Sequence, residues 1–328
     1  MSITPGEYLK TIWHMLPEIA EQTGYPWLYI TRYFVLYYIK YRVQIDEFQT
    51  LRLYEYSPRK VDEYLLWRRC MRYSDGLNAQ ATKEELDVFE DKHIFNRVFG
   101  EFVNREWLYI PEAAPSDIEK FMSRHPVFLV KTCTGTQGKS IYRFASDEIT
   151  PKEIIRRFGN GRFLLESLIV QHPLLQAVNP GSVNTVRLVV AKKNDKICFV
   201  GAGLRCGGSG QFVDNFHHDG AAYPIDLETG RVTGPGIDLK GNSVLCHSTT
   251  GYVMPGLQVP HWQMLLNRVR EASGIVPHVG YIGWDLAITE NGVEFVEGNV
   301  NYPGNNIIQI DGPGAWRRLK KFVDEMPG

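Results

Sequence analysis

Cysteine is scarce in this sequence, and the cysteines that are present form no recognisable pattern. The 328 residues include five of them, and no two form a C-x-x-C pair. An odd and scattered set argues against both a disulfide framework and a thiolate zinc site. A reducing compartment fits this usage best, so we expect the protein to be cytoplasmic.

The chain also lacks an excess of charge and long apolar runs. It has 36 Lys and Arg against 37 Asp and Glu, so no overall field favours nucleic acid or an anionic membrane, although a local basic site stays open. The N-terminal residues do not show the basic and then apolar pattern of a signal peptide. The most membrane-like stretch, residues 25–43, is interrupted by Arg32, Lys40 and Arg42. We expect a buried or partner-facing helix there in preference to a membrane-associated one, and no transmembrane segment.

The sequence has two parts with different patterns of apolar residues. Residues 1–122 have apolar residues at three- and four-residue spacing, which predicts a mainly helical region. From residue 123 to 328, short apolar runs alternate with glycine turns, and Asn194-Asp195 and Asn291-Gly292 are expected turn centres. The pattern predicts an α+β fold with a mostly antiparallel sheet.

The stretch "KTCTGTQGKS", residues 131–140, ends like a phosphate-binding P-loop. A P-loop needs glycine at the position of Cys133 and a helix directly after Ser140, but "IYRFAS" follows and alternates like a strand. A hairpin tip carrying Gly135 and Gly138, with Lys131 at its base, can instead close over phosphates. A plain hairpin with a surface lysine is the alternative.

A second hairpin carries oxygen ligands. In "GWDLAITENGVEFVEGNVNYPG", Asp285, Glu297 and Asn299 are suited to Mg²⁺, which takes a few carboxylates together with phosphate oxygens. A three-residue loop of residues 290–292 would place Asp285 opposite Glu297, with Asn299 on the same face. A two-residue turn at Asn291-Gly292 would turn Asp285 away. We predict the three-residue loop.

Together these motifs resemble the ATP-grasp superfamily. More narrowly, "DKHIFN", "QHPLL…NPGSVNTVRLVV" and "VEGNVNYPG" resemble the sugar-transfer-associated ATP-grasp family, over nearly the whole chain. The resemblance implies an ATP-grasp fold of two α+β subdomains, with a helical N-terminal extension. The lid subdomain would span about 123–165, and the C-terminal subdomain about 166–328.

The resemblance also implies roles for individual residues. Lys131 and Lys92 would contact the nucleotide phosphates, and the backbone of residues 134–140 would close over them. Glu166 and the Leu168 backbone would hold the adenine edge, with Gln171 or His172 near the ribose. Asp285, Glu297 and Asn299 would bind Mg²⁺, with Glu297 bridging two ions.

A cation for the transferred phosphoryl group must come from elsewhere, because "YIGWD" lacks the arginine that many ligases of this superfamily place before the metal-binding Asp. Arg187 is the first candidate, since it lies within an apolar strand and is costly there unless paired. Arg205 is the second. Asn215 resembles an asparagine near the nucleotide and metal in related ligases. The adjacent His217 and His218 would point to opposite faces, which disfavours zinc.

The resemblance implies an ATP-dependent ligase that activates a carboxylate as an acyl phosphate for attack by an amine or similar nucleophile. Its partners would be a small-molecule or glycan carboxylate and an acceptor, in carbohydrate, polysaccharide or related secondary metabolism. A kinase on the same fold and a non-catalytic nucleotide-binding protein are the alternatives. The oligomeric state stays open.

Lys131→Ala should lower kcat/KM for ATP about tenfold to a hundredfold, because it removes a charge-assisted contact to phosphate. Lys139→Ala is the matched control and should have a smaller effect. A greater loss in Lys139→Ala would restore the P-loop interpretation.

Overall fold

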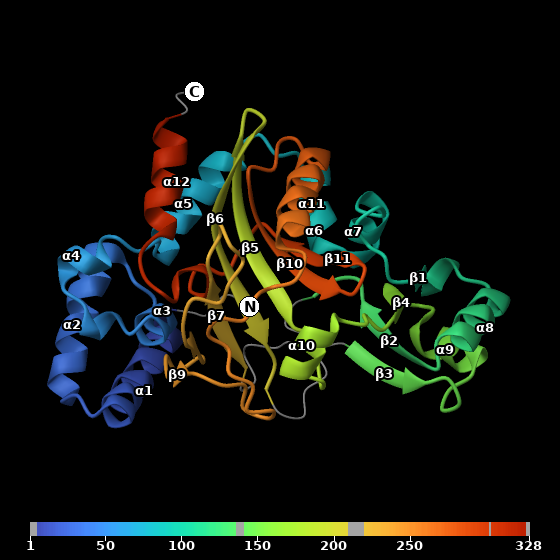
Figure 1. The fold of residues 1–328 in the computed structure, drawn as a ribbon, viewed down its shortest axis with the longest axis horizontal. Coiled ribbons are helices and arrows are strands. Elements are labelled where there is room, and N and C mark those ends of the chain that lie inside the picture. Colours follow the sequence, from blue (N-terminus) through green and yellow to red (C-terminus); the bar gives the residue numbers. More distant parts are fainter. Residues whose placement is uncertain (1–4, 136–140, 209–219, 302, 326–328) are drawn as a thin grey trace.

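The computed structural model describes residues 5–135, 141–208, 220–301 and 303–325. Two antiparallel sheets lie side by side, and helices cover both (Figure 1). The predicted α+β class with antiparallel sheets is therefore confirmed. Within the described ranges, each helix is too short or too polar to cross a membrane.

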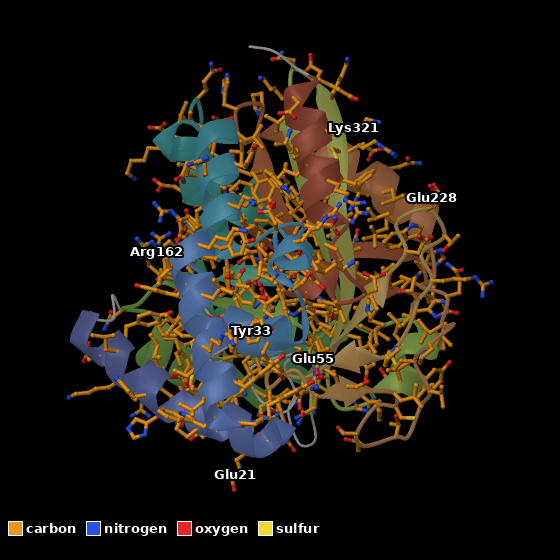
Figure 2. All side chains as sticks on the ribbon, turned by 90° about the vertical axis from the view of Figure 1, so that its left-hand side faces the viewer. Glu21, Tyr33, Glu55, Arg162, Glu228 and Lys321 are labelled. Atoms are coloured by element: carbon orange, nitrogen blue, oxygen red, sulfur yellow. The ribbon has the colours of Figure 1, made fainter. Side chains whose placement is uncertain are left out.

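The N-terminal part is helical, as predicted. Its elements are α1 (Pro5–Thr23), α2 (Trp27–Tyr41), α3 (Ile45–Thr50), η1 (Leu53–Glu55), α4 (Pro58–Val61), α5 (Trp67–Leu77), α6 (Lys83–Glu90) and α7 (Lys92–Val98). The first four helices form their own core, in which Phe34, Phe48 and Tyr54 are fully or almost fully buried. In Figure 2 these helices face the viewer, with Tyr33 of α2 labelled.

The smaller sheet has the strand order β1-β4-β2-β3. Its strands are β1 (Trp107–Tyr109), β2 (Val127–Thr132), β3 (Ile141–Ala145) and β4 (Phe163–Ser167), covered by η2 (Ile110–Glu112), α8 (Pro115–Arg124) and α9 (Pro151–Phe158). Strand β3 is the strand expected where a P-loop would have a helix. The division at residue 122 stays a prediction, and the strand pairing groups β1 with strands that lie beyond it.

The larger sheet has the order β11-β10-β5-β6-β7-β8-β9. Its strands are β5 (Thr185–Lys193), β6 (Lys196–Cys206), β7 (Ala221–Ile225), β8 (Gly236–Ile237), β9 (Ser243–Val244), β10 (Tyr281–Thr289) and β11 (Gly292–Asn299). The accompanying helices are α10 (Pro173–Val178), α11 (Trp262–Ile275), η3 (Ile307–Gln309) and α12 (Ala315–Asp324). Asn194 and Asp195 have φ of 50° and 60°, which confirms the predicted β5–β6 turn.

The two faces of the larger sheet have different partners. Val186 and Leu188 of β5 face the core shared with α6, α7 and α11, whereas Val189 and Ala191 face α5 and α12. Trp284 is fully buried and contacts four phenylalanine rings, at positions 89, 95, 99 and 295. These rings hold α6 and α7 against the β10–β11 hairpin.

The β10–β11 hairpin contains one extra residue, within β11. Thr289 pairs with Gly292, so the turn has two residues, Glu290 and Asn291. Leu286 pairs with Phe295, but Asp285 pairs with Glu297. The predicted pairing of Asp285 with Glu297 is confirmed, whereas the predicted three-residue loop is wrong. The turn is one residue shorter than expected, and a bulge at Val296 restores the register.

This bulge decides which side chains reach the second face of the sheet. Val293 and Phe295 point into the core, and after the bulge Val300 does so too. Glu297 and Asn299 therefore lie on the opposite face. Without the bulge, strict alternation from Phe295 would have placed both on the core face. Gly298, between them, faces the core, where an added Cβ would lie 2.6 Å from the Phe89 ring.

Gly298→Ala should lower the free energy of unfolding by about 1–3 kcal/mol, because the added methyl group overpacks the contact with Phe89. Urea unfolding measures the change. Gly234→Ala is the control, since a Cβ there meets nothing within 4 Å. Equal stability of the two variants would show that the close packing at Gly298 is unimportant.

Candidate active site

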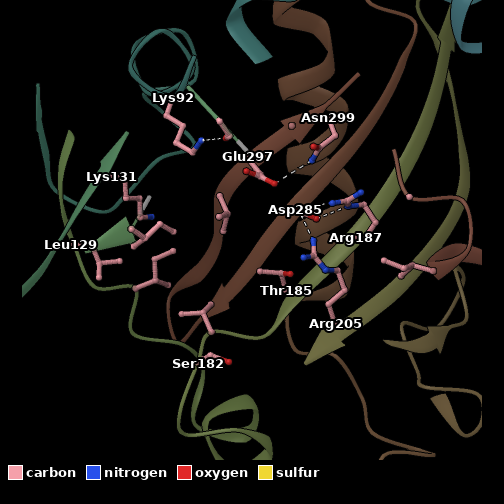
Figure 3. Close-up of a pocket in the computed structure, with 18 of the residues that line it drawn as sticks. Lys92, Leu129, Lys131, Ser182, Thr185, Arg187, Arg205, Asp285, Glu297 and Asn299 are labelled. Carbon is pink, nitrogen blue, oxygen red and sulfur yellow. Dashed lines mark hydrogen bonds and ion pairs between the residues drawn. The ribbon is translucent and has the colours of Figure 1, made fainter. Parts of the chain in front are cut away.

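A cleft of about 1460 Å³ opens between the two sheets (Figure 3). Lys131 of β2 lines one side, and Asp285 and Glu297 of the β10–β11 hairpin line the other. Arg187 and Arg205 lie on the floor that β5 and β6 provide. The structure thus brings together residues that are widely separated in the sequence.

The hairpin directs oxygen atoms into this cleft. Asp285 and Glu297 are cross-strand neighbours, and Asn299 Nδ2 donates to Glu297 Oε1 at 3.5 Å. Burial and the neighbouring charge of Asp285 raise the pKa of Glu297. Two buried carboxylates this close are stabilised when a cation lies between them. The position and chemistry of these three side chains match the predicted metal ligands.

Asp285 is held by two arginines. Arg187 donates from Nε to Oδ1 at 2.5 Å and from Nη2 to Oδ2 at 2.8 Å, and Arg205 Nη1 donates to Oδ2 at 2.9 Å. Burial alone would raise the pKa of Asp285, but the two guanidinium groups outweigh it and hold the pKa well below its usual value. Arg187 also donates to the Pro303 carbonyl at 2.8 Å. The expectation that a buried Arg187 needs a partner is confirmed, and its phosphoryl role stays a prediction.

A buried chain of ion pairs links the two sheets. Lys131 Nζ lies 2.6 Å from Glu166 Oε2, Arg105 Nε lies 3.1 Å from the same oxygen, and Arg105 Nη1 lies 2.6 Å from Glu294 Oε1. Burial would raise the pKa of Glu166, but Arg105 and Lys131 hold it well below its usual value. We call Lys131, Glu166, Arg105 and Glu294 the buried ion chain.

Sequence reasoning missed Arg105 and Glu294. Arg105 also donates to Asn96 Oδ1 at 3.1 Å and to the Phe295 carbonyl at 2.8 Å. A carboxylate within an apolar strand needs a partner, and this holds for Glu294 as well as for Glu297. The partner itself could not be identified, because Arg105 lies almost two hundred residues earlier in the chain.

Lys92 lies where helix α7 meets the glycine loop. Its backbone N–H donates to the Cys133 carbonyl at 2.8 Å, and its Nζ donates to the Gly135 carbonyl at 3.0 Å. Gly135 has a φ of 110°, a conformation that favours glycine. Lys131 therefore lies at the base of the loop, as predicted, and Lys92 lies beside Gly135, while its contact with phosphate stays a prediction. Residues 136–140, with Gly138, and residues 209–219, with Asn215, His217 and His218, lie outside the described residues.

The segment after β4 offers an apolar wall. Leu168 lines the cleft with 39% of its surface exposed, together with Leu129 and Ile141 of the smaller sheet. The Glu166 side chain is fully buried in the ion chain, so only its backbone is available to an adenine edge. The adenine role of Glu166 and Leu168 stays a prediction.

The expected ribose contacts need correction. Gln171 Nε2 donates to the carbonyl groups of Asn179 and Ser182 at 2.8 and 3.0 Å, and its Oε1 accepts from the Asn184 N–H at 3.0 Å. The buried amide of Gln171 is thus occupied by protein groups. His172 accepts through Nδ1 from the Leu174 N–H at 3.1 Å and thereby caps helix α10. Both side chains position the segment before β5, and residue type alone did not reveal these contacts.

The far end of the cleft is formed by the N-terminal helices. The lining residues there are Met15, Asp46, Glu47, Gln49, Thr50, Trp67, Leu239 and Lys240. Thr50 Oγ1 donates to the Leu239 carbonyl at 3.0 Å, and Glu47 accepts from the Trp67 N–H at 2.6 Å. Helix α3 is thereby tied both to α5 and to the 238–242 loop.

The donor set fits Mg²⁺ in its chemistry. Glu297 and Asn299 offer hard oxygen atoms, and Asp285 keeps carboxylate capacity beyond its three arginine contacts. Across the part of the chain that the structure describes, no three His, Cys, Asp or Glu side chains could hold a metal together. An ion at this hairpin would therefore complete its coordination with phosphate oxygens, as Mg²⁺ commonly does.

Arg105→Met should lower the free energy of unfolding by about 3–5 kcal/mol, because it leaves Glu166 and Glu294 buried without a counter-ion. Urea unfolding measures this loss. Arg162→Met is the matched control. Arg162 is 53% exposed in its ion pair with Asp91, so its loss should cost about 0–1 kcal/mol. Similar losses in both variants would contradict a structural role for the buried ion chain.

Comparisons with known proteins identify the family of this chain. A family model described as sugar-transfer associated ATP-grasp matches residues 68–324. No curated protein sequence matches the chain significantly. Similar solved structures include D-alanyl-alanine synthetase A from Vibrio cholerae, at 15% identity, 74% of this chain, 66% of that chain and a TM-score of 0.45.

Two further structures show comparable likeness. The D-alanine-D-alanine ligase from Coxiella burnetii has 13% identity, with 75% of this chain and 60% of that chain covered and a TM-score of 0.42. The carboxyaminoimidazole ribonucleotide synthase from Aspergillus clavatus has 11% identity, 66% and 46% coverage and a TM-score of 0.41. This chain thus spans about half of the latter protein. By the family match over most of its length, the chain has the ATP-grasp fold and belongs to the sugar-transfer associated ATP-grasp family.

Proposed function

We propose that this protein is an ATP-dependent ligase that activates a carboxylate as an acyl phosphate for attack by an amine or similar nucleophile. The observation that carries the proposal is the single cleft in which Lys92, Lys131, two arginines and the Asp285–Glu297 pair converge. Family membership supports ATP as the phosphoryl donor. The family description associates the chain with sugar transfer, so we place the reaction in carbohydrate, polysaccharide or related secondary metabolism.

The nucleotide would lie between the two sheets. Leu129, Ile141 and Leu168 offer apolar surface for a base, and the Leu168 backbone would contact its edge. Lys131 is held in place by Glu166, which keeps its ammonium group at the base of the glycine loop. Lys92 adds a second positive charge next to Gly135. Fixed cations of this kind favour the polyphosphate end of ATP.

Asp285, Glu297 and Asn299 would hold Mg²⁺. When bound, Mg²⁺ would neutralise the phosphate oxygens during transfer. Arg187 uses three of its nitrogens on Asp285 and Pro303. We therefore assign to Arg187 the positioning of Asp285, and Arg187 and Arg205 both stay candidates for neutralising the transferred phosphoryl group. Asn215 stays a prediction as an asparagine near the nucleotide and metal.

The chemistry needs positioning and charge more than covalent catalysis. A carboxylate oxygen of the acid forms a bond to the γ-phosphorus, the bond from that phosphorus to the β–γ bridging oxygen breaks, and ADP leaves with the electron pair. The nucleophile then attacks the acyl carbon, the carbon–oxygen bond to phosphate breaks, and the amine gives up a proton. No cysteine or serine nucleophile is required.

The acceptor would bind at the far end of the cleft. This end lies beyond the arginines and is lined by Asp46 and Trp67 of the N-terminal helices and by Lys240. The cleft exceeds the ~300–1,000 Å³ of a site for one small ligand. Two substrates therefore have room side by side, as an acyl transfer requires.

With ATP, Mg²⁺ and mixtures of carboxylic acids, added hydroxylamine should trap the activated acid as a hydroxamate with release of ADP. Glu297→Ala should lower ADP release by about a hundredfold or more, because it removes charge stabilisation of the transferred group. Glu290→Ala is the matched control, since Glu290 is an exposed carboxylate at the tip of the same hairpin. Colorimetric hydroxamate detection and ADP release give the two readouts.

Other results would change the assignment. A stable phosphorylated alcohol without hydroxamate would identify a kinase. Binding of Mg-ATP without ADP release, whatever acids, alcohols and amines are supplied, would identify a non-catalytic nucleotide-binding protein.

A further inference from the structure

The outer face of helix α2 is apolar and basic. The exposed residues of this helix are Trp27, Leu28, Arg32, Val35, Leu36, Ile39 and Lys40. Leu28 and Ile39 expose 72% and 67% of their surface. Helix α2 contains no acidic residue, and a further basic residue, Arg42, follows its last turn. A surface helix usually turns its charged and polar residues outward, so this face departs from the rule.

The inner face of α2 accounts for its attachment to the protein. Ile30, Phe34 and Tyr37 are buried against the N-terminal core. Leu28, Arg32, Val35 and Ile39 follow one another at helical spacing on the other side. The helix was expected to be buried or partner-facing, and only one of its sides is buried. Among the described residues, no other segment covers the opposite side.

The apolar exposure extends to the neighbouring helix. In α1, which packs beside α2, Leu9 and Trp13 expose 57% and 64% of their surface. Folded soluble proteins rarely leave large apolar side chains grouped in this way unless a protein or membrane covers them. All of these residues precede the part of the chain that the family model matches. The surface is thus additional to the catalytic core.

Charge decides which occupant fits. A symmetric pair of chains would bring the same face of α2 against itself, and this interface would hold Arg32 and Lys40 of both copies with no acidic residue of α2 to pair with them. An anionic lipid surface has the complementary charge and accepts leucine, isoleucine and tryptophan side chains at the boundary of its headgroups. Tryptophan favours this boundary, and Trp27 at the start of α2 exposes 40% of its surface.

We propose that the outer face of α2 binds an anionic membrane surface, with the helix lying in the plane of the interface. Leu28, Val35 and Ile39 enter the headgroup region, while Arg32, Lys40 and Arg42 contact lipid phosphates. Binding in this manner needs no membrane-spanning helix. Helices α1 and α3 line the far end of the cleft and share a core with α2, so the attached protein would work close to the membrane.

Flotation of the full chain with lipid vesicles tests this proposal. The protein should float with vesicles of phosphatidylcholine mixed with phosphatidylglycerol, and much less with phosphatidylcholine alone. Leu28→Asp with Ile39→Asp should weaken binding at least about tenfold. Arg32→Gln and Lys40→Gln should each weaken it about fivefold, and added salt should do the same.

Val253→Asp is the matched control, since Val253 is 56% exposed but distant in sequence from α2. It should bind vesicles like the unmodified protein, and thermal unfolding should show that all variants are folded. Equal flotation of the Leu28/Ile39 variant would overturn the proposal. So would light scattering that shows a dimer which this variant dissociates, because the face would then belong to a second copy or another protein.

Discussion

Arg105 has to satisfy two carboxylates, and this requirement connects the two halves of the molecule. Its guanidinium is almost fully buried between Glu166 of the smaller sheet and Glu294 of the larger one. A planar fork of five donors serves both carboxylates together with the Asn96 and Phe295 oxygens, whereas a lysine ammonium has only three donors. Through Glu166 the same network holds Lys131, and through Glu294 it holds β11, so the position of the cation at the loop is fixed relative to the oxygen ligands.

Local pattern was sufficient to predict much of the fold. In "NTVRLVV" the alternation of residues puts Val186 and Leu188 on one face of the strand and Arg187 on the other. The structure has the same arrangement, because apolar side chains collect on the face that the helices cover. The β5–β6 turn and the helix over residues 25–43 also followed from residue type. These features depend on neighbours within a few positions, which is the range over which sequence patterns are informative.

The remaining features depend on distant contacts. The site of the extra residue at Val296 is set by how β11 packs on Phe89 and Trp284, and a hairpin loop of three residues would have given the same pairing at Asp285. The Gln171 amide looked available because its partners come from a loop that folds back over it. Residue type alone could not reveal either packing arrangement.

The bulge at Val296 also has an evolutionary consequence. The extra residue decides which face of the sheet each later side chain of β11 occupies. Deletion of Val296 would therefore move Glu297 and Asn299 to the core face and their neighbours to the cleft face. Insertions and deletions should therefore be strongly selected against at this point, even though hairpins generally tolerate them at their tips. In an alignment that ignores the extra residue, a core side chain of a relative would be matched to Glu297 or Asn299.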